Sequence, residues 1–187
     1  MIGCRPGEEF TITVDGTDCE VEEKGGKGRK KGKKDPKLYS QKFNGAGVRY
    51  EVAVAIFSDH IVSVKGPFPC GRYPDLKIYK EFGLSERLLA AGERAVADGT
   101  YRHFTVSERG KGRSSWRAYK NRFRARQETV NNRIKIFNCF QQRWRHSHKH
   151  HGDTFRAAVF FTQLSFQYNP LMSSLVYTHY KGKKHLK

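Results

Sequence analysis

The stretch Val48–Phe57 reads VRYEVAVAIF, with apolar residues at positions 48, 50, 52, 54 and 56. Successive side chains of a β-strand point to opposite faces of a sheet, so this alternation is typical of a strand with one buried face. The polar turn Ser58-Asp59-His60 leads into a second apolar run, Ile61–Val64. The two runs therefore predict a β-hairpin, which ends at Pro67-Phe68-Pro69.

Shorter patterns flank the hairpin and extend the prediction in both directions. Upstream, the β-branched run Phe10–Val14 predicts a strand that stops at the turn Asp15-Gly16. Downstream, the helical spacing of apolar residues from Leu76 to Ala91 predicts two short helices, the second of them capped by Ser85. The run Arg94–Ala97 then predicts a brief buried strand.

Two longer helices are expected nearer the C-terminus. Apolar residues recur every three or four positions from Tyr119 to Phe137, which predicts an amphipathic helix of about five turns. Another is expected from Asp153 to Gln167, capped by Asp153 or Thr154. The aromatic residues near these helices are expected in the core rather than on a base-stacking surface; they are Trp144, Phe155, Phe160, Phe161 and Phe166. The order of strand, hairpin, helix, strand and two helices predicts an α/β fold, an RNase H-like mixed sheet flanked by helices.

The length of 187 residues suits one domain with tails. We expect a tail at residues 1–9, a domain at residues 10–171 and a basic tail at residues 172–187. The four cysteines include no CxxC pair, so neither a disulfide scaffold nor a zinc module is indicated. Neither a membrane-spanning run nor an apolar secretory segment is found, so an intracellular protein without a membrane partner is expected.

The charge of the chain points to a polyanionic partner. The sequence has 36 Lys and Arg against 18 Asp and Glu, a formal charge of +18. Such an excess opposes compactness unless an anion neutralises it, and nucleic acid is the expected partner. Two stretches without any acid concentrate the cations, Lys24–Lys34 and Arg109–Arg126. The first is expected to be a basic insertion, either a solvated linker or an arm that contacts phosphates, and Lys30–Lys34 fits a nuclear-import signal.

The positions of the acids are informative because acids are in the minority. Asp15 and Asp98 each follow a predicted strand, and Glu128 lies on the long helix away from its apolar face. Three carboxylates at one edge of a sheet repel one another unless a cation lies between them. Hard oxygen ligands suit Mg²⁺ or Mn²⁺, which activates water and stabilises the leaving 3′ oxygen of a phosphodiester. The alternative is two ordinary turn acids and a surface glutamate.

Four segments, taken in order, resemble the DDE endonuclease domain of PIF/Harbinger-type transposases. They are VDGTD at 14–18, GPFP at 66–69 with PDLKI at 74–78, ADGTY at 97–101 and RARQETVN at 124–131. The resemblance runs from about Phe10 to Leu171 and implies an RNase H-like nuclease that binds a divalent metal and cuts DNA. It also implies a separate DNA-reading partner protein, allows a homo-oligomer and, in a eukaryote, indicates a nuclear protein.

The resemblance implies Asp15, Asp98 and Glu128 as the catalytic, metal-binding triad. Asp75 belongs to the family's proline-then-acid turn after the hairpin. It is either a fourth acid near the metals or the cap of the helix that starts at Leu76. It also competes with Asp98 for the role of second catalytic aspartate, and the position of Asp98 after the fourth strand favours Asp98.

Cations on the long helix complete the expected site. Arg124, Glu128 and Lys135 match the signature Tyr-x2-Arg-x3-Glu-x6-Lys of related bacterial insertion-sequence enzymes, with Asn121 at the tyrosine position. These three residues share one helix face, as groups that contact the DNA backbone beside bound metals should. The expected DNA-binding residues are Arg122, Arg124, Arg126 and Lys135.

Departures from the family leave a second function open. The chain begins almost at the first strand, a basic run is inserted after Glu23, and the connection from Asp98 to Glu128 is short. A catalytically inactive remnant that binds DNA or a partner protein is therefore the alternative to an active endonuclease. An RNA-binding protein would need stacking motifs that are not found. The histidines of Arg145–His151 have unsuitable spacing for zinc.

Overall fold

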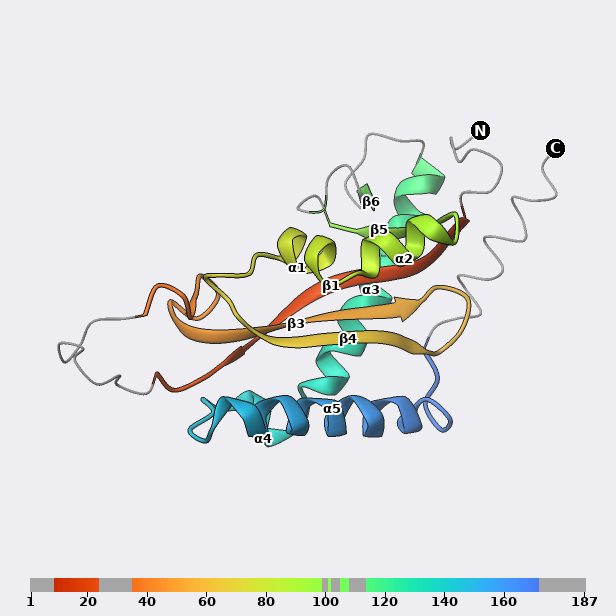
Figure 1. Ribbon diagram of the computed structural model, residues 1–187. Helices are drawn as coiled ribbons and strands as arrows, with labels where there is room; N and C mark the ends of the chain where they lie inside the picture. The colour runs from red at the N-terminus through yellow and green to blue at the C-terminus, as the bar shows by residue number, and fades with distance from the viewer. Residues whose placement is uncertain (1–8, 24–34, 99–100, 102–104, 108–113, 172–187) are drawn as a thin grey trace, which may run out of the picture.

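The computed structural model describes residues 9–23, 35–98, 101, 105–107 and 114–171. The expected insertion 24–34, nearly all of the 1–9 tail, the 172–187 tail and part of the basic stretch 109–126 lie outside the described residues. The described part has three layers, with two short helices on one face of a mixed sheet and two long helices on the other (Figure 1). The predicted α/β class, a mixed sheet flanked by helices, is confirmed.

The sheet has six strands within the described residues. β3 (Gly45–Ala55) lies between β1 (Glu9–Glu20) and β4 (Ile61–Pro69) and is antiparallel to both. β5 (Glu93–Ala97) and β6 (Thr105–Ser107) continue the sheet beyond β1 as parallel strands. The predicted hairpin is thus confirmed as β3 and β4, and the predicted strand after the short helices is confirmed as β5.

β1 is longer than the sequence predicts. The Asp15-Gly16 pair predicts a turn because glycine readily adopts positive φ. Gly16 instead continues the strand and pairs with Glu51 of β3. The prediction that the strand stops at Asp15 is therefore wrong, and Asp15 lies inside β1 rather than at its end. A short strand that the sequence did not predict, β2 (Tyr39–Ser40), pairs with the beginning of β3.

Two short helices, α1 (Asp75–Glu81) and α2 (Leu84–Ala90), cover one face of the sheet. Their existence was predicted, but Ser85 does not cap α2. Gly83 precedes the helix with φ of 77°, a left-handed conformation that glycine adopts without steric cost, and Ser85 is buried. The core on this face consists of Ile12, Val14, Ala53, Tyr79, Leu84, Leu88, Ala95, Ala97 and Tyr101.

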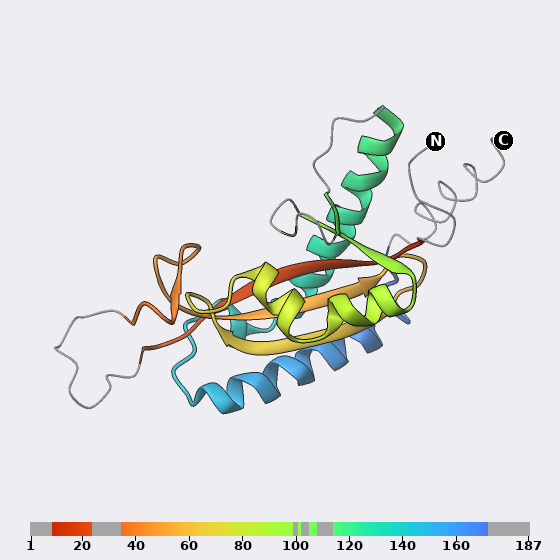
Figure 2. The same cartoon turned by 45° about the horizontal axis from the view of Figure 1, so that its top comes forward.

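The other face is covered by α3 (Ser114–Ile134) and α5 (His148–Ser165), with α4 (Asn138–Gln141) between them in the chain. Figure 2 shows the N-terminal half of α3 extending beyond the sheet. α5 begins before the predicted Asp153 or Thr154, and Ser147 caps it by accepting from the Lys149 amide. The first turn of α5 is polar, so apolar periodicity could not reveal it.

Only one side of α5 is buried, which corrects the predicted core. Phe155 and Phe166 are buried in the hydrophobic core between α5 and the sheet, whereas Phe160 and Phe161 are 60% and 57% exposed. The expectation that all these aromatic residues are core is therefore wrong for Phe160 and Phe161. Within the residues that are described, no helix is long and apolar enough to cross a membrane.

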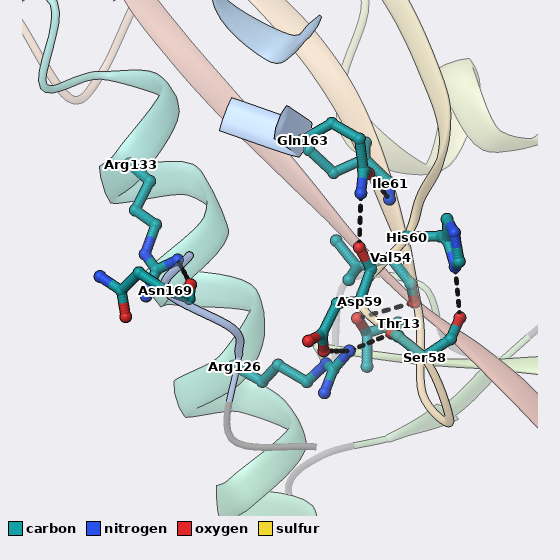
Figure 3. Close-up of polar contacts among 10 residues, drawn as sticks. All are labelled: Thr13, Val54, Ser58, Asp59, His60, Ile61, Arg126, Arg133, Gln163 and Asn169. Carbon is teal, nitrogen blue, oxygen red and sulfur yellow. Dashed lines mark hydrogen bonds and ion pairs between the residues drawn. The ribbon is translucent and has the colours of Figure 1, made fainter. Parts of the chain in front are cut away.

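The turn between β3 and β4 is held by residues from both long helices (Figure 3). Arg126 of α3 is 2% exposed, donates to the Ser58 carbonyl and lies 3.2 Å from Asp59 Oδ1. Gln163 of α5 donates to the Asp59 carbonyl at 2.6 Å and accepts from the Ile61 amide at 2.7 Å. The expectation that Arg126 contacts DNA does not hold, because its guanidinium is buried against this turn.

Candidate active site

Asp15 and Asp98 come together where the parallel pairing of β1 and β5 ends. Thr13 pairs with Val96, so Asp15 and Asp98 each follow the last printed pair by two residues, and the charge of Asp98 acts on Asp15. Asn131 of α3 donates to Asp15 Oδ2 at 2.8 Å, so Asp15 faces α3. Val96 packs on the same face, and alternation along β5 places Asp98 there as well. The structure thus places two residues of the predicted triad, Asp15 and Asp98, on the same face of the sheet.

Asp75 approaches from the opposite face of β1. It is the first residue of α1 and lies directly over Gly16, and Pro74 rather than Asp75 occupies the N-cap position of the helix. A Cβ on Gly16 would come within 1.9 Å of Asp75 Oδ1, so the carboxylate occupies the space that glycine leaves. The same oxygen lies 3.3 Å from Arg49 Nη1 but is not aligned for a hydrogen bond. Of the two predicted roles, the helix cap is wrong.

The three aspartates interact electrostatically. Burial raises the pKa of Asp15 to about 6, and the charges of Asp75 and Asp98 act in the same direction. The pKa of Asp75 is also raised, first by burial and then by Asp18 and Asp98, while Arg49 opposes the shift. Carboxyl groups that repel one another in this way are stabilised by a nearby cation.

Glu51 is a buried acid beside this group that sequence reasoning missed. It lies in β3 opposite Gly16, is 2% exposed, and neither of its carboxyl oxygens has a hydrogen-bond partner. Burial raises the pKa of Glu51 to about 8, and the charge of Asp75 adds to the shift. The group is therefore mostly protonated at neutral pH. The sequence signal was an acid inside a strand that is otherwise apolar.

Glu128, the third predicted acid, points elsewhere. Its Oε1 accepts from Arg124 Nε at 2.8 Å, and its side chain is 55% exposed. Asn131, one turn further along α3, takes the place beside Asp15. The structure therefore does not bring the Glu128 carboxylate to Asp15, although residues three apart on a helix share a face. A rotation of the Glu128 side chain away from Arg124 would be needed to join them.

The predicted cations on α3 and directly after it have three different environments. Arg122 and Arg124 are exposed, as a surface that contacts phosphates requires. Lys135 is partly buried and donates from Nζ to the Asp18 carbonyl at 2.8 Å, which ties the end of α3 to β1. Burial lowers the pKa of Lys135. Arg126, as described above, is structural.

A second network that the sequence did not reveal joins β1, β2 and β3. Arg49 donates to both oxygens of Asp18, at 2.6 and 3.0 Å, and Ser40 Oγ donates to Asp18 Oδ2 at 2.7 Å. Burial acts to raise the pKa of Asp18, but the hydrogen bonds from Arg49 hold it below its ordinary value. Asp18 and Arg49 are directly opposite in the β1–β3 register, where opposite charges stabilise strand pairing.

The donor set fits a Mg²⁺ or Mn²⁺ ion only in part. In the described part of the chain, no three His, Cys, Asp or Glu side chains are grouped closely enough to hold a metal. Mg²⁺, however, is commonly held by one or two protein carboxylates, with water and substrate oxygens completing its shell. Asp15 and Asp98 supply two carboxylates for that smaller requirement, and the charge of Asp98 adds to the burial and the Asp75 charge that raise the pKa of Asp15.

Known proteins give no further guide to the site. Comparisons of the chain with family models, curated proteins and solved structures found no match. The chemistry of Asp15, Asp75 and Asp98, together with the cations beside them, therefore carries the functional inference.

Proposed function

We propose that this protein is a transposase-derived, divalent-metal-dependent DNA endonuclease with an RNase H-like fold. Asp15 and Asp98 hold Mg²⁺ or Mn²⁺, and Glu128 joins them when its carboxylate leaves Arg124. When bound, the ion supplies activation of an attacking water and stabilisation of the leaving 3′ oxygen of a phosphodiester. The hydrogen bond from Asn131 orients Asp15, and Arg49 restrains Asp75 as an accessory acid.

The observation that carries this function is that Asp98, which follows β5, lies near enough to Asp15 of the neighbouring β1 for its charge to act on the Asp15 carboxyl. In open sheets, ligands and reacting groups collect where strands end and connections diverge. The succession of strand, hairpin, helices, strand and helix agrees with the order implied by the family resemblance, which supports the RNase H-like assignment.

Further support comes from the charge around the acids. The exposed Arg122 and Arg124 lie on α3, the helix that supplies Asn131 to Asp15. A DNA backbone that contacts these arginines would bring phosphates toward the carboxylates. Cations of this kind position nucleic acid without reading its sequence, so recognition of a target site would fall to a separate DNA-reading partner.

The test is Mn²⁺-dependent nicking of supercoiled DNA. Asp15→Asn and Glu128→Gln are each expected to lower the rate on the order of 100-fold, because each removes a metal-binding carboxylate. Glu86→Gln is the matched control, since Glu86 is exposed on α2 away from the acids. Circular dichroism confirms that each variant is folded. Equal rates for the parent protein and Asp15→Asn would sink the assignment.

A catalytically inactive DNA-binding or partner-binding remnant is the second candidate function. The observation that favours it is the ion pair of Glu128 with Arg124, which leaves Asn131 rather than Glu128 beside Asp15. Calorimetric titration with Mn²⁺ separates the two functions. A nuclease binds Mn²⁺ and loses affinity in Asp98→Asn, whereas a remnant shows DNA binding without Mn²⁺ binding. The same titration of Asp75→Asn identifies the second catalytic aspartate.

A further inference from the structure

A second pair of acids, Glu51 and Asp75, lies on the face of β1 that is turned away from Asp15. Asp15 faces α3, whereas Asp75 belongs to α1 on the opposite face of the sheet and fills the side-chain space of Gly16. Glu51 is directly opposite Gly16 in the antiparallel β1–β3 register. Opposite residues of such a pair share one face of the sheet, so Glu51 extends on the side of Asp75. The chemistry proposed above gives Glu51 no role.

The two carboxyl groups are close enough to share an ion. Asp75 Oδ1 lies within 1.9 Å of the position that a Cβ on Gly16 would take. Since opposite Cβ atoms are about 4.5 to 5.5 Å apart, that oxygen is within about 7.5 Å of the Glu51 Cβ. A glutamate side chain and one ion with metal–oxygen distances of about 2.1 Å span that gap. Of the charges that act on the pKa of Glu51, that of Asp75 has the largest effect.

The oxygens of this pair lack the partners that buried polar atoms normally have. Glu51 is 2% exposed, and neither of its oxygens has a hydrogen-bond partner, although Lys65 is opposite it in the β3–β4 register. Asp75 Oδ1 is also buried without a hydrogen bond, because Arg49 directs its hydrogen bonds to Asp18. Buried polar atoms are nearly always satisfied in folded proteins, so these oxygens indicate a ligand.

A small hard cation fits this donor set. Mg²⁺ and Mn²⁺ take carboxylate oxygens, and Mg²⁺ is commonly held by one or two of them with water in its remaining positions. Water can reach the pair, since the Asp75 side chain is 25% exposed. A cavity of about 630 Å³, whose wall includes Gly16, Arg49 and Pro74, opens beside Asp75 and has room for the water shell of an ion.

We propose that Glu51 and Asp75 form a second divalent-cation site, which takes Mg²⁺ or Mn²⁺ with water completing its shell. The ion joins the start of α1 to β3. A carboxyl must lose its proton to bind a metal, so the ion replaces the proton that Glu51 keeps in the metal-free protein. The proposal does not depend on DNA cleavage, because it uses neither Asp15 nor Asp98.

Calorimetric titration with Mn²⁺ tests the site in a full-length double variant, Asp15→Asn with Asp98→Asn, which lacks the carboxylates of the proposed cleavage site. At about pH 8, where Glu51 releases its proton readily, we expect this variant to retain one binding event. Adding Glu51→Gln is expected to lower the Mn²⁺ affinity at least tenfold. Glu86→Gln, exposed on α2, is the control. Mn²⁺ is also expected to raise the thermal midpoint of the double variant, but not after Glu51→Gln is added.

A further variant tests the geometry without changing a ligand. In Gly16→Ala the added methyl group would overlap Asp75 Oδ1, so the carboxylate must move. Mn²⁺ affinity of the double variant is expected to fall on the order of tenfold. Gly45→Ala is the matched control, because its added methyl group would have the Phe43 carbonyl oxygen as its nearest neighbour, at 3.6 Å. Circular dichroism confirms that each variant is folded.

The possible results separate this site from the proposed endonuclease. Absence of Mn²⁺ binding in the double variant would overturn the second site, as would binding that both Glu51→Gln and Gly16→Ala leave unchanged. Binding that depends on Glu51, in a protein whose parent form does not nick DNA, would support the second site and reject the endonuclease alone. Normal nicking by the parent protein, without Mn²⁺ binding in the double variant, would reject the second site alone.

Discussion

Glu51 is a single buried carboxyl that makes stability depend on pH. Its pKa is raised by burial from 4.5 to about 8, so the folded state keeps a proton that the unfolded chain releases. The stabilisation is complete below pH 4.5 and is lost as pH rises through 8, with an upper limit of about 5 kcal/mol. Glu51→Gln removes this loss. Urea denaturation is expected to show that the stability of the variant relative to the parent protein is higher at about pH 8 than at about pH 5.

The comparison uses pH dependence because the glutamine amide is itself buried without a partner and lowers stability at every pH. Glu86→Gln, at an exposed position of α2, is expected to keep the pH dependence of the parent protein. The same difference between Glu51→Gln and the parent at both pH values would contradict the assignment.

His151 has the opposite effect on pH dependence. It is fully buried, its Nδ1 lies 2.7 Å from the Tyr50 hydroxyl, and burial lowers its pKa from 6.5 to about 4. The unfolded chain therefore takes up the proton first. Stability from the neutral ring is complete above pH 6.5 and is lost as pH falls through 4, on the order of 3 kcal/mol. His151→Phe is expected to flatten this acid limb in urea denaturation, whereas His150→Phe, exposed on the same helix, leaves it steep.

At the scale of elements, the long helices hold the hairpin through the turn between β3 and β4. Arg126→Met removes the cation that pairs with Asp59 and the donor to the Ser58 carbonyl. Loss of one partner of a buried ion pair is expected to cost about 2 to 4 kcal/mol, measured by thermal or urea denaturation. The Ile61 amide donates to Gln163 at the end of the same turn, and its hydrogen exchange is expected to accelerate. Unchanged stability would show that the contacts of Arg126 with Ser58 and Asp59 do not stabilise the protein.

Apolar periodicity predicted the elements that bury a single face. It failed where a turn-like composition or contacts on both faces of a strand determine the structure. The first strand of the hairpin and the long α3 were predicted because their apolar residues recur at two or at three to four positions, whereas β5 was predicted from a short apolar run. β1 was cut short because Asp15-Gly16 has the composition of a turn. The small residue at Gly16 serves a different purpose there, since the Asp75 carboxylate fills the space of a side chain. Sequence patterns do not show such contacts between distant segments.

The candidate site could be predicted only in part for the same reason. Asp15 and Asp98 were predicted together from strand order, because β1 and β5 are parallel neighbours, although Asp15 lies inside β1 rather than at its end. Glu51 and the pair of Asp18 with Arg49 depend on the β1–β3 register, which places residues far apart in the chain opposite one another. The direction of the Glu128 side chain depends on a competing cation, Arg124, one turn away. Helix phase fixes which face a residue occupies but not which partner its carboxylate selects.

For the whole molecule, the excess of cations does not translate into an equal number of DNA contacts. Some of the cations are structural: Arg126 is buried, Arg49 pairs with Asp18, and Lys135 is bound to a β1 carbonyl. Others, such as Arg122 and Arg124, are exposed on α3. The net charge of +18 therefore overstates the phosphate-binding surface. Salt dependence of DNA affinity measures that surface directly, because each phosphate contact releases counterions.

Single substitutions can count these contacts on the molecule as a whole. The slope of log affinity against log salt is expected to fall by about one for Arg122→Ala and for Arg124→Ala, since each removes about one phosphate contact. Arg126→Met changes the net charge by the same amount, yet its slope is expected to match that of the parent protein, provided that binding is measured at a temperature where the variant is folded. Filter binding at several salt concentrations gives the slopes. If all three substitutions lower the slope equally, net charge rather than an exposed face of α3 governs DNA binding, and the arrangement proposed for the site is wrong.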